Sequence, residues 1–237
     1  MAQLLKRFAF PKKSMHILVL LLSADLFFVL LHLAHKAARL LDMFSTIRND
    51  VFNLYYDLTL AESFQYVKEY WIIILFAWLI IKKKDVFYTG WALLFTYLLF
   101  DDMLGFHGGL ATFFLERFGI DSGHILFGEM RYQDFGELGV SLFFGILFLS
   151  LIAISYFRGG KEVRTIFHYL VGGLLLIVFF GVVNDFVNRI FNEDTNQIMF
   201  EISRLIEDGG EMLGMSVMCW YVFTLTVPDP TPLEANS

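Results

Sequence analysis

The chain has 237 residues and a net charge of −6, with 57% hydrophobic and 18% charged residues. Its mean hydropathy of +0.61 excludes an ordinary soluble domain and indicates that the lipid bilayer is its partner. The acidic balance, without a basic patch among aromatic residues, excludes nucleic acid as an expected partner. The single cysteine, Cys219, excludes a disulfide within one chain and a cysteine-based metal site.

Six apolar segments approach the length of about 20 residues that a membrane-spanning helix needs. In chain order they cover residues 15–38, 62–81, 86–106, 135–157, 163–188 and 207–227. The sequence therefore predicts an all-α fold, a polytopic membrane bundle of about six transmembrane helices over residues 15–227. Residues 1–14 form a basic arm, and the first helix is expected to be retained because no small-residue cleavage site follows it. Residues 228–237 form a polar tail that we expect to be disordered.

Local signals mark the ends of several helices. Thr59 with Glu62 three residues later is a capping-box pattern that begins the second helix. Gly159 is expected to end the fourth helix and Pro228 the sixth, because proline cannot continue a helix. The connections 39–61 and 107–134 carry aromatic residues at helical spacing, which predicts interfacial helices there.

The distribution of basic residues predicts the orientation. Ten of the eighteen Lys and Arg residues lie in the N-terminal arm and in the segments 82–84 and 158–164. Because short cytoplasmic segments carry an excess of positive charge, both termini are expected in the cytoplasm. The expected location is a cell membrane, as a multi-pass protein of the inner membrane.

A repeated pattern fits three tandem hairpins. Residues 136–141, Gly-Glu-Leu-Gly-Val-Ser, resemble residues 210–216, Gly-Glu-Met-Leu-Gly-Met-Ser, and each preceding helix carries an acid near its outer end, Asp101 or Asp185. The first hairpin is looser, with Asp25 followed by Glu62. An old duplication explains this pattern, although short Gly-Glu matches also arise by chance.

Ionisable residues collect at one depth of the predicted bundle. At about 1.5 Å per residue, Asp101 lies about 24 Å from the cytoplasmic start of its span, in the outer leaflet. The candidate site residues at this depth are Asp101, Asp102, His107, Glu137, Asp185, Glu207, Asp208, Glu211, His32 and His35. Carboxylates inside a span are costly and are expected to face the interior, pair, or bind a ligand. We therefore expect Asp102, Glu137, Asp185 and Glu211 to converge in the outer half of the bundle.

Helical spacing refines this expectation. Asp25, His32 and His35 recur at intervals of seven and three residues, which places them on one inward stripe of the first helix. Asp101 and Asp102 are adjacent, about 100° apart around the helix, so only one of them is expected to point to the centre.

A purely structural interpretation stays open. Arg189 lies four residues after Asp185, and Arg204 lies three before Glu207, so these acids could be neutralised within their own helices. Arg39 could serve the same purpose near His35. Mid-span lysines are not expected, which excludes a retinal Schiff base.

Carboxylate and imidazole side chains in one layer suit a divalent metal cation. Calcium or magnesium is expected if carboxylates dominate, and zinc or iron if His32, His35 and His107 contribute. The helical metal motifs His-Glu-x-x-His and Glu-x-x-His are absent. Gly-x-Ser-x-Gly is absent as well, so no serine nucleophile is indicated.

Three function classes follow from these observations. The first is a channel or transporter for cations or protons, with an acidic vestibule on the outer side. The second is a non-catalytic subunit of a larger membrane complex or homo-oligomer, in which the polar groups hold the bundle together. The third is a metal-dependent intramembrane hydrolase with histidine ligands and a carboxylate as general base.

Overall fold

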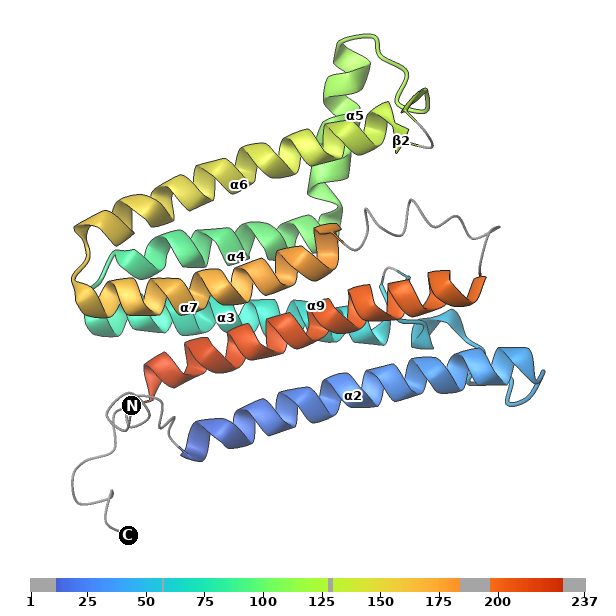
Figure 1. Ribbon diagram of the computed structural model, residues 1–237, viewed down its shortest axis with the longest axis horizontal. Helices are drawn as coiled ribbons and strands as arrows, with labels where there is room; N and C mark the ends of the chain where they lie inside the picture. The colour runs from blue at the N-terminus through green and yellow to red at the C-terminus, as the bar shows by residue number, and fades with distance from the viewer. Residues whose placement is uncertain (1–11, 57, 128–129, 184–196, 228–237) are drawn as a thin grey trace. The chain divides into compact units, whose positions relative to one another are not determined.

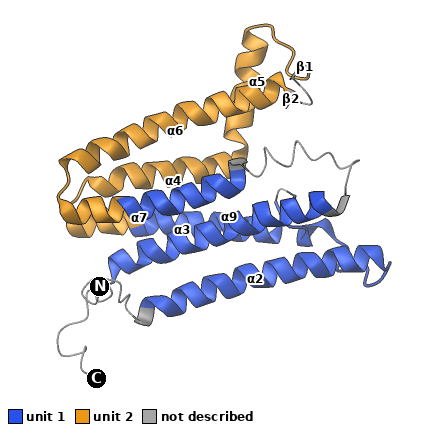
Figure 2. Ribbon diagram, in the orientation of Figure 1, with its two compact units in different colours: residues 1–75, 168–237 blue, residues 76–167 orange. Residues whose placement is uncertain are grey.

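The computed structural model describes residues 12–56, 58–127, 130–183 and 197–227. In these residues seven α-helices carry nearly all of the regular structure (Figure 1), which confirms the predicted helical class. The chain divides into two compact units, unit 1 with residues 1–75 and 168–237, and unit 2 with residues 76–167 (Figure 2). Helices α3 (Leu60–Lys83) and α7 (Lys161–Val178) each contribute to both units.

Unit 1 is organised around two long helices, α2 (Lys12–Leu40) and α9 (Gln197–Thr226), which pack along each other. A short 3-10 helix, η1 (Asp50–Phe52), lies in the connection that follows α2. Helix α7 continues into a π-helical turn, η2 (Phe179–Val183), which packs against α9. The core of this unit includes the buried apolar side chains of Leu21, Ile72, Met215, Met218 and Val222.

Unit 2 contains α4 (Phe87–Leu104), α5 (Phe106–Arg117) and α6 (Tyr132–Arg158) with the end of α3. Helix α4 packs closely against α6, because a Cβ atom at Gly90 would lie only 3.0 Å from the side chain of Ile152. Two very short strands, β1 (Ile125–Phe127) and β2 (Met130–Arg131), pair antiparallel before α6. The core is aromatic, with Phe76, Tyr88, Trp91 and Phe95 buried together.

Four helical segments of the described chain are long and apolar enough to cross a membrane, namely Ser14–Leu40, Leu60–Lys83, Tyr132–Arg158 and Lys161–Gly181. A fifth crossing results if α4 and α5 count as one span, although they meet at an angle of 73°. Gly105 forms this corner with a φ of +58°, a backbone conformation that glycine adopts without strain. These helices are compatible with a multi-pass membrane protein, whereas the bundle of six transmembrane helices stays a prediction.

The structure corrects some helix boundaries and confirms others. The predicted cap by Thr59 is present, since Thr59 Oγ1 accepts a hydrogen bond from the Glu62 amide. The Glu62 carboxylate, however, accepts from the Leu58 amide, one residue before the Thr59 amide that a capping box uses. Helix α6 ends at Arg158, directly before Gly159 as predicted. Helix α9, however, begins at residue 197 instead of 207, so its acids lie in the middle of a helix and not in its first turns.

The two predicted interfacial helices have different outcomes. Helix α5 occupies residues 106–117, as expected for the connection 107–134. In the connection 39–61 the prediction is wrong, because among the residues described between α2 and α3, which leave out residue 57, only the three of η1 are helical. Side-chain hydrogen bonds from α2 hold this connection instead of a helix.

Candidate functional site

A buried lysine joins three helices of unit 1. Lys68 of α3 is fully buried. Its Nζ donates to Asp25 Oδ1 of α2 at 3.1 Å, and to the Met212 carbonyl oxygen at 2.9 Å and Ser216 Oγ at 3.3 Å, both on α9. An ammonium group has three N–H bonds, so every donor of Lys68 has an acceptor.

Asp25 completes this group, which we call the Lys68–Asp25 pair. Its Oδ1 accepts from Lys68, and its Oδ2 accepts a hydrogen bond from Ser216 Oγ at 2.5 Å. Asp25 is 6% exposed and Ser216 is fully buried. The attraction within a buried ion pair offsets the lost hydration only if the remaining hydrogen-bonding positions are also filled. Both carboxylate oxygens meet that condition here.

The placement of the pair follows from helical periodicity. Asp25, His32 and His35 are all buried, as expected for a stripe with intervals of seven and three residues. On α9, Met212 and Ser216 are one turn apart and therefore face the same neighbours. The pair is thus formed where the polar stripe of α2 meets a buried face of α9.

A second polar group lies about three turns further along α2, and we call it the Tyr55 cluster after its central residue. Lys36 Nζ donates to Glu201 Oε1 at 2.7 Å, and the Tyr55 hydroxyl donates to the Glu201 carbonyl oxygen at 3.0 Å. The cations of Lys36 and Arg204 lie 4.8 and 5.6 Å from the centre of the Tyr55 ring. Burial raises the pKa of Tyr55 above its ordinary range, and the neighbouring Glu201 adds to the rise.

The two histidines of α2 hold the connection to α3. His32 Nδ1 accepts a hydrogen bond from the Leu54 amide at 3.0 Å, while His35 Nδ1 lies 2.8 Å from the Ile47 carbonyl oxygen and therefore carries the proton. Arg39 binds Asp50 at 2.9 Å, and Asp50 also lies 3.9 Å from His35 Nε2. The predicted proximity of Arg39 to the surroundings of His35 is confirmed.

An apolar layer separates the Lys68–Asp25 pair from the Tyr55 cluster. It contains the buried side chains of Leu54, Ala61 and Met212, with Phe28 and Leu205 packed against them. Asp25 and Lys36, the α2 members of the two polar groups, are eleven residues apart, or about 16 Å along the helix axis. The seam between α2 and α9 therefore alternates a buried ion pair, an apolar layer and a partly exposed polar cluster.

On another face of α9, the Glu211 side chain packs against the π-helical turn. A methyl group at Gly181 of η2 would overlap the Glu211 carboxylate, and one at Gly210 would overlap the Phe180 ring. Single π-helical turns inside longer helices are often found at functional sites. The close approach of α9 and η2 depends on these two glycines.

In unit 2 the acid at the corner between α4 and α5 has a structural contact. Asp101 Oδ1 accepts from the His107 amide at 2.7 Å, and its Oδ2 lies 3.0 Å from His107 Nδ1. Asp101 is buried whereas Asp102 is exposed, so one of the two faces inward as predicted, but it is not the residue assigned to the shared site. Glu137 accepts a hydrogen bond from Gln133 Nε2 at 2.9 Å.

The predicted site residues are distributed over both units. His32, His35, Glu207, Asp208 and Glu211 lie in unit 1, whereas Asp101, Asp102, His107 and Glu137 lie in unit 2. Asp185 lies outside the described residues, so the convergence of the acids stays a prediction. Among the residues that the structure describes, no group of three or more His, Cys, Asp or Glu side chains is placed to hold a metal ion.

Sequence reasoning missed Lys68. The expectation of no mid-span lysine is wrong, because Lys68 lies within the candidate span Leu60–Lys83 and is fully buried there. The sequence does contain a signal for it. Asp25 is the one acid of α2, and because an unpaired charge within a span is costly, a cation is expected on a neighbouring helix.

Comparison with known proteins gives a family but no activity. The model of a family described as a domain of unknown function, DUF8692, matches residues 15–226. No curated protein and no solved structure matches the chain. The geometry of the chain's own residues must therefore supply the functional argument.

Proposed function

Since the chain belongs to the DUF8692 family, whose description assigns no activity, we propose from the geometry that it is a membrane protein that moves protons or cations, with the Lys68–Asp25 pair as its titrating site. The observation that carries the proposal is a fully buried lysine inside a candidate span, bound to an acid on another helix. Ionisable residues within membrane segments are costly, and they commonly mark proton relays and ion pathways.

The chemistry of the pair supports proton transfer over binding of a divalent metal. The Lys68 ammonium already occupies the position beside Asp25 that an exogenous cation would take. A proton added to Asp25 leaves a net positive charge in the bundle, and a proton removed from Lys68 leaves a net negative one. Such unbalanced charge is strongly disfavoured at low dielectric, so the protonation of the pair is coupled to other charges or to movement of the helices.

The apolar layer supports a gated pathway. Leu54, Ala61 and Met212 pack together against Tyr55, and the Met212 carbonyl oxygen accepts a hydrogen bond from Lys68, so this layer contacts both polar groups. Apolar constrictions in channels stop ions by excluding water. In this proposal the layer isolates Asp25 from the Tyr55 cluster until α2 and α9 separate enough to admit water.

A second candidate is a non-catalytic subunit of a membrane complex, and the hydrogen bonding of the same pair favours it. Every N–H bond of Lys68 and both oxygens of Asp25 have partners. A polar network in which every hydrogen bond is made can have a purely structural role, which is to fix the packing of the helices. The two candidates therefore differ in whether the pair titrates during function.

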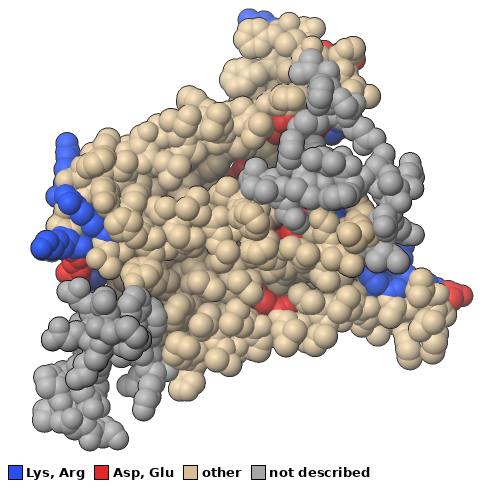
Figure 3. All heavy atoms as spheres, viewed as in Figure 1, with Lys and Arg blue, Asp and Glu red and all other residues tan. Residues whose placement is uncertain are grey.

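We also propose that the connections α3–α4 and α6–α7 face the cytoplasm, together with both termini. Figure 3 shows Lys and Arg gathered at the end of unit 2 where these two connections lie, and the residues concerned are Lys82, Lys83, Lys84, Arg158, Lys161 and Arg164. The test uses a chain with Cys219→Ser and Lys83→Cys. Replacing the buried Cys219 leaves the thiol at position 83 as the single site for labelling. A thiol reagent that does not cross the membrane should label position 83 only when it is added on the cytoplasmic side. Labelling from outside would show that the proposed orientation is wrong.

Reconstitution in liposomes tests the transport proposal. The purified protein is placed in vesicles that contain a pH-sensitive dye, and a potassium gradient with valinomycin supplies the driving force. The parent should acidify or alkalinise the vesicle interior according to the sign of the potential. Asp25→Leu with Lys68→Met should abolish this flux while the helices stay packed, because an apolar pair of similar volume often replaces a buried ion pair without loss of stability.

The matched control changes a partly exposed ion pair that shares helix α2 with the Lys68–Asp25 pair but joins it to α9. Lys36→Gln with Glu201→Gln removes the side-chain pair of the Tyr55 cluster, whose members are each about 35% exposed. This control should lower the flux at most modestly, since such pairs contribute little to stability. An apolar-pair variant as active as the parent, or a parent without flux for protons or monovalent cations, would favour the subunit.

A further inference from the structure

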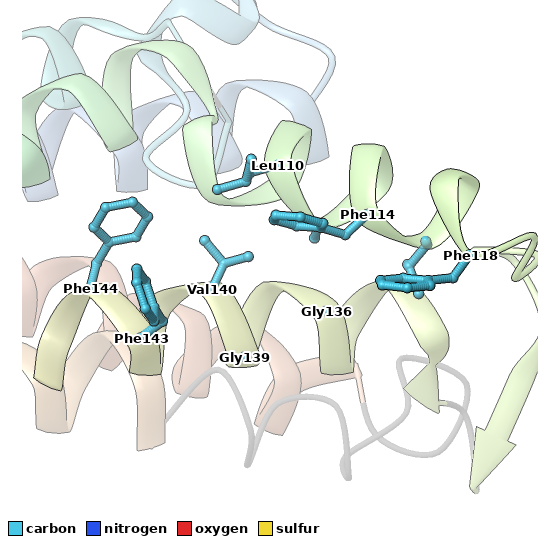
Figure 4. Close-up of a pocket in the computed structure, with 10 residues that line it drawn as sticks. Leu110, Phe114, Phe118, Gly136, Gly139, Val140, Phe143 and Phe144 are labelled. Atoms are coloured by element: carbon cyan, nitrogen blue, oxygen red, sulfur yellow. The ribbon is translucent and has the colours of Figure 1, made fainter. Parts of the chain in front are cut away.

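An apolar groove lies between α5 and α6 of unit 2. It encloses about 410 Å³, within the range of ligand pockets. Figure 4 shows its two walls, with Leu110 and Phe114 on α5 and Phe118 directly after it, opposite Gly136, Gly139 and Phe143 on α6. All ten described residues that line it are apolar or glycine.

The two glycines of α6 have different roles in this groove. A Cβ atom at Gly136 would lie 3.0 Å from the Ala111 side chain, so Gly136 allows α5 and α6 to touch. A Cβ atom at Gly139 would meet no described atom within 4 Å. Gly139 therefore leaves space where a larger residue would fill the groove, and its absence of a side chain creates the depth.

The surroundings of the groove indicate what fills it. Its open side is formed by Phe114, Phe118 and Phe143, which are 46%, 75% and 64% exposed. Helix α6 is a candidate span with only 6% of its apolar window buried, so hydrocarbon surrounds it in a bilayer. An empty groove there would deprive its walls of contacts that a hydrocarbon chain supplies.

One end of the groove adds a charge. Phe118 directly follows Arg117, an exposed residue that ends α5. A guanidinium group is suited to phosphate because its N–H bonds match the oxygens in geometry and charge. The apolar wall with a terminal arginine matches the acyl chain and the phosphate of a phospholipid. We infer that the groove between α5 and α6 is a binding site for one phospholipid, whose acyl chain lies against Gly139 and whose phosphate lies toward Arg117.

The test compares two leucine substitutions on the same helix. Gly139→Leu fills the groove, whereas Gly145→Leu adds the same side chain at a position that also meets nothing within 4 Å but does not line the groove. The full-length proteins are purified in detergent, stripped of lipid, and titrated with dioleoyl phosphatidylglycerol. Native mass spectrometry counts the bound lipid, and the midpoint of thermal unfolding is measured in parallel.

We expect the parent and Gly145→Leu each to bind one added phospholipid. Gly139→Leu should bind it about tenfold more weakly, or less tightly still, because the leucine removes the contacts of several methylene groups. Added lipid should raise the unfolding midpoint of the parent but not of Gly139→Leu. Equal lipid retention by all three proteins would overturn the inference. A change from dimer to monomer in Gly139→Leu alone would also overturn it, by assigning the groove to a second copy of the chain.

A second variant covers the case in which Gly139→Leu does not fold. Leu110→Gln places an amide on the opposite wall with almost no added bulk, and burying an amide without a partner is unfavourable. It should lower lipid retention in the same way. Unchanged retention in Leu110→Gln would contradict the inference.

Discussion

Replacement of Lys68 by methionine should destabilise the protein far more than replacement of Lys68 and Asp25 together. Lys68→Met removes the cation from a site in which Asp25 is 6% exposed, so a carboxylate is left buried without its counter-charge. Removing one partner of a buried ion pair costs about 3–5 kcal/mol. Asp25→Leu should cost a similar amount, because the ammonium then keeps only the Met212 carbonyl oxygen and Ser216 Oγ as acceptors.

The change in the free energy of unfolding of the double variant shows whether the two residues act as a pair. Independent effects would add to about 6–10 kcal/mol, whereas an apolar pair of similar volume is often neutral or stabilising relative to a buried ion pair. We therefore expect Asp25→Leu with Lys68→Met to lie within about 2 kcal/mol of the parent. The Ser216 hydroxyl loses an acceptor in this variant but can bond to the backbone of its own helix.

The free energy of unfolding is measured in mixed micelles of lipid and detergent by titration with a denaturing detergent. Circular dichroism follows the loss of helix, and the parent, the two single variants and the double variant form a double-mutant cycle. The reasoning would be refuted by a Lys68→Met variant within about 1 kcal/mol of the parent, since that is the value for a hydrated pair. Strict additivity in the double variant would refute it as well.

Three further predictions concern other contacts. Gly181→Ala should cost about 1–3 kcal/mol through overlap with a carboxylate of α9, whereas Gly172→Ala, with open space around it, should leave the thermal unfolding midpoint unchanged or slightly higher. Asp101→Ala should cost about 1–3 kcal/mol, measured by the same unfolding titration, because it removes the acceptor of the partly buried His107 amide at the corner between α4 and α5. Tyr55→Phe should remove one tyrosine whose pKa lies above the usual value of about 10 in an ultraviolet titration. Because the pKa of this phenol is raised in the folded state, its contribution to stability is fully present below pH about 10. That contribution is lost as the pH rises through the folded pKa. A tyrosine titration identical in Tyr55→Phe and the parent would contradict the last prediction.

Most helix positions could be predicted from the sequence because their signals are local. Thr59 with Glu62, and Gly159, set helix ends through neighbouring backbone groups, and the structure agrees at both. The start of α9 was missed because Glu201 and Arg204 interrupt the apolar pattern on which a search for spans depends. These two residues belong to the Tyr55 cluster, so tertiary contacts and not local hydropathy account for them.

The candidate site was less predictable because its partners are distant in sequence. Lys68 and Asp25 are 43 residues apart, and Lys68 and Ser216 are 148 apart. Periodicity shows which face of α2 is buried, but it does not show which helix covers that face. The neighbouring Glu69 also makes Lys68 look locally compensated, which hides its need for a partner on another helix.

The Lys68–Asp25 pair also bears on how the chain is assembled during synthesis. Helices α2 and α3, both candidate spans, supply the acid and the lysine. Each charge would cost about 2.5–3.5 kcal/mol at the centre of a helix in a bilayer, so their association favours early pairing of the two helices. Ser216 emerges 148 residues after Lys68, which at about 5–20 residues per second is a delay of roughly 7–30 s. Until the last helix arrives, the ammonium lacks two of its three acceptors. Helix α9 therefore completes the hydrogen bonding of Lys68, and a nascent chain that ends before α9 keeps a buried ammonium group with two unfilled hydrogen bonds.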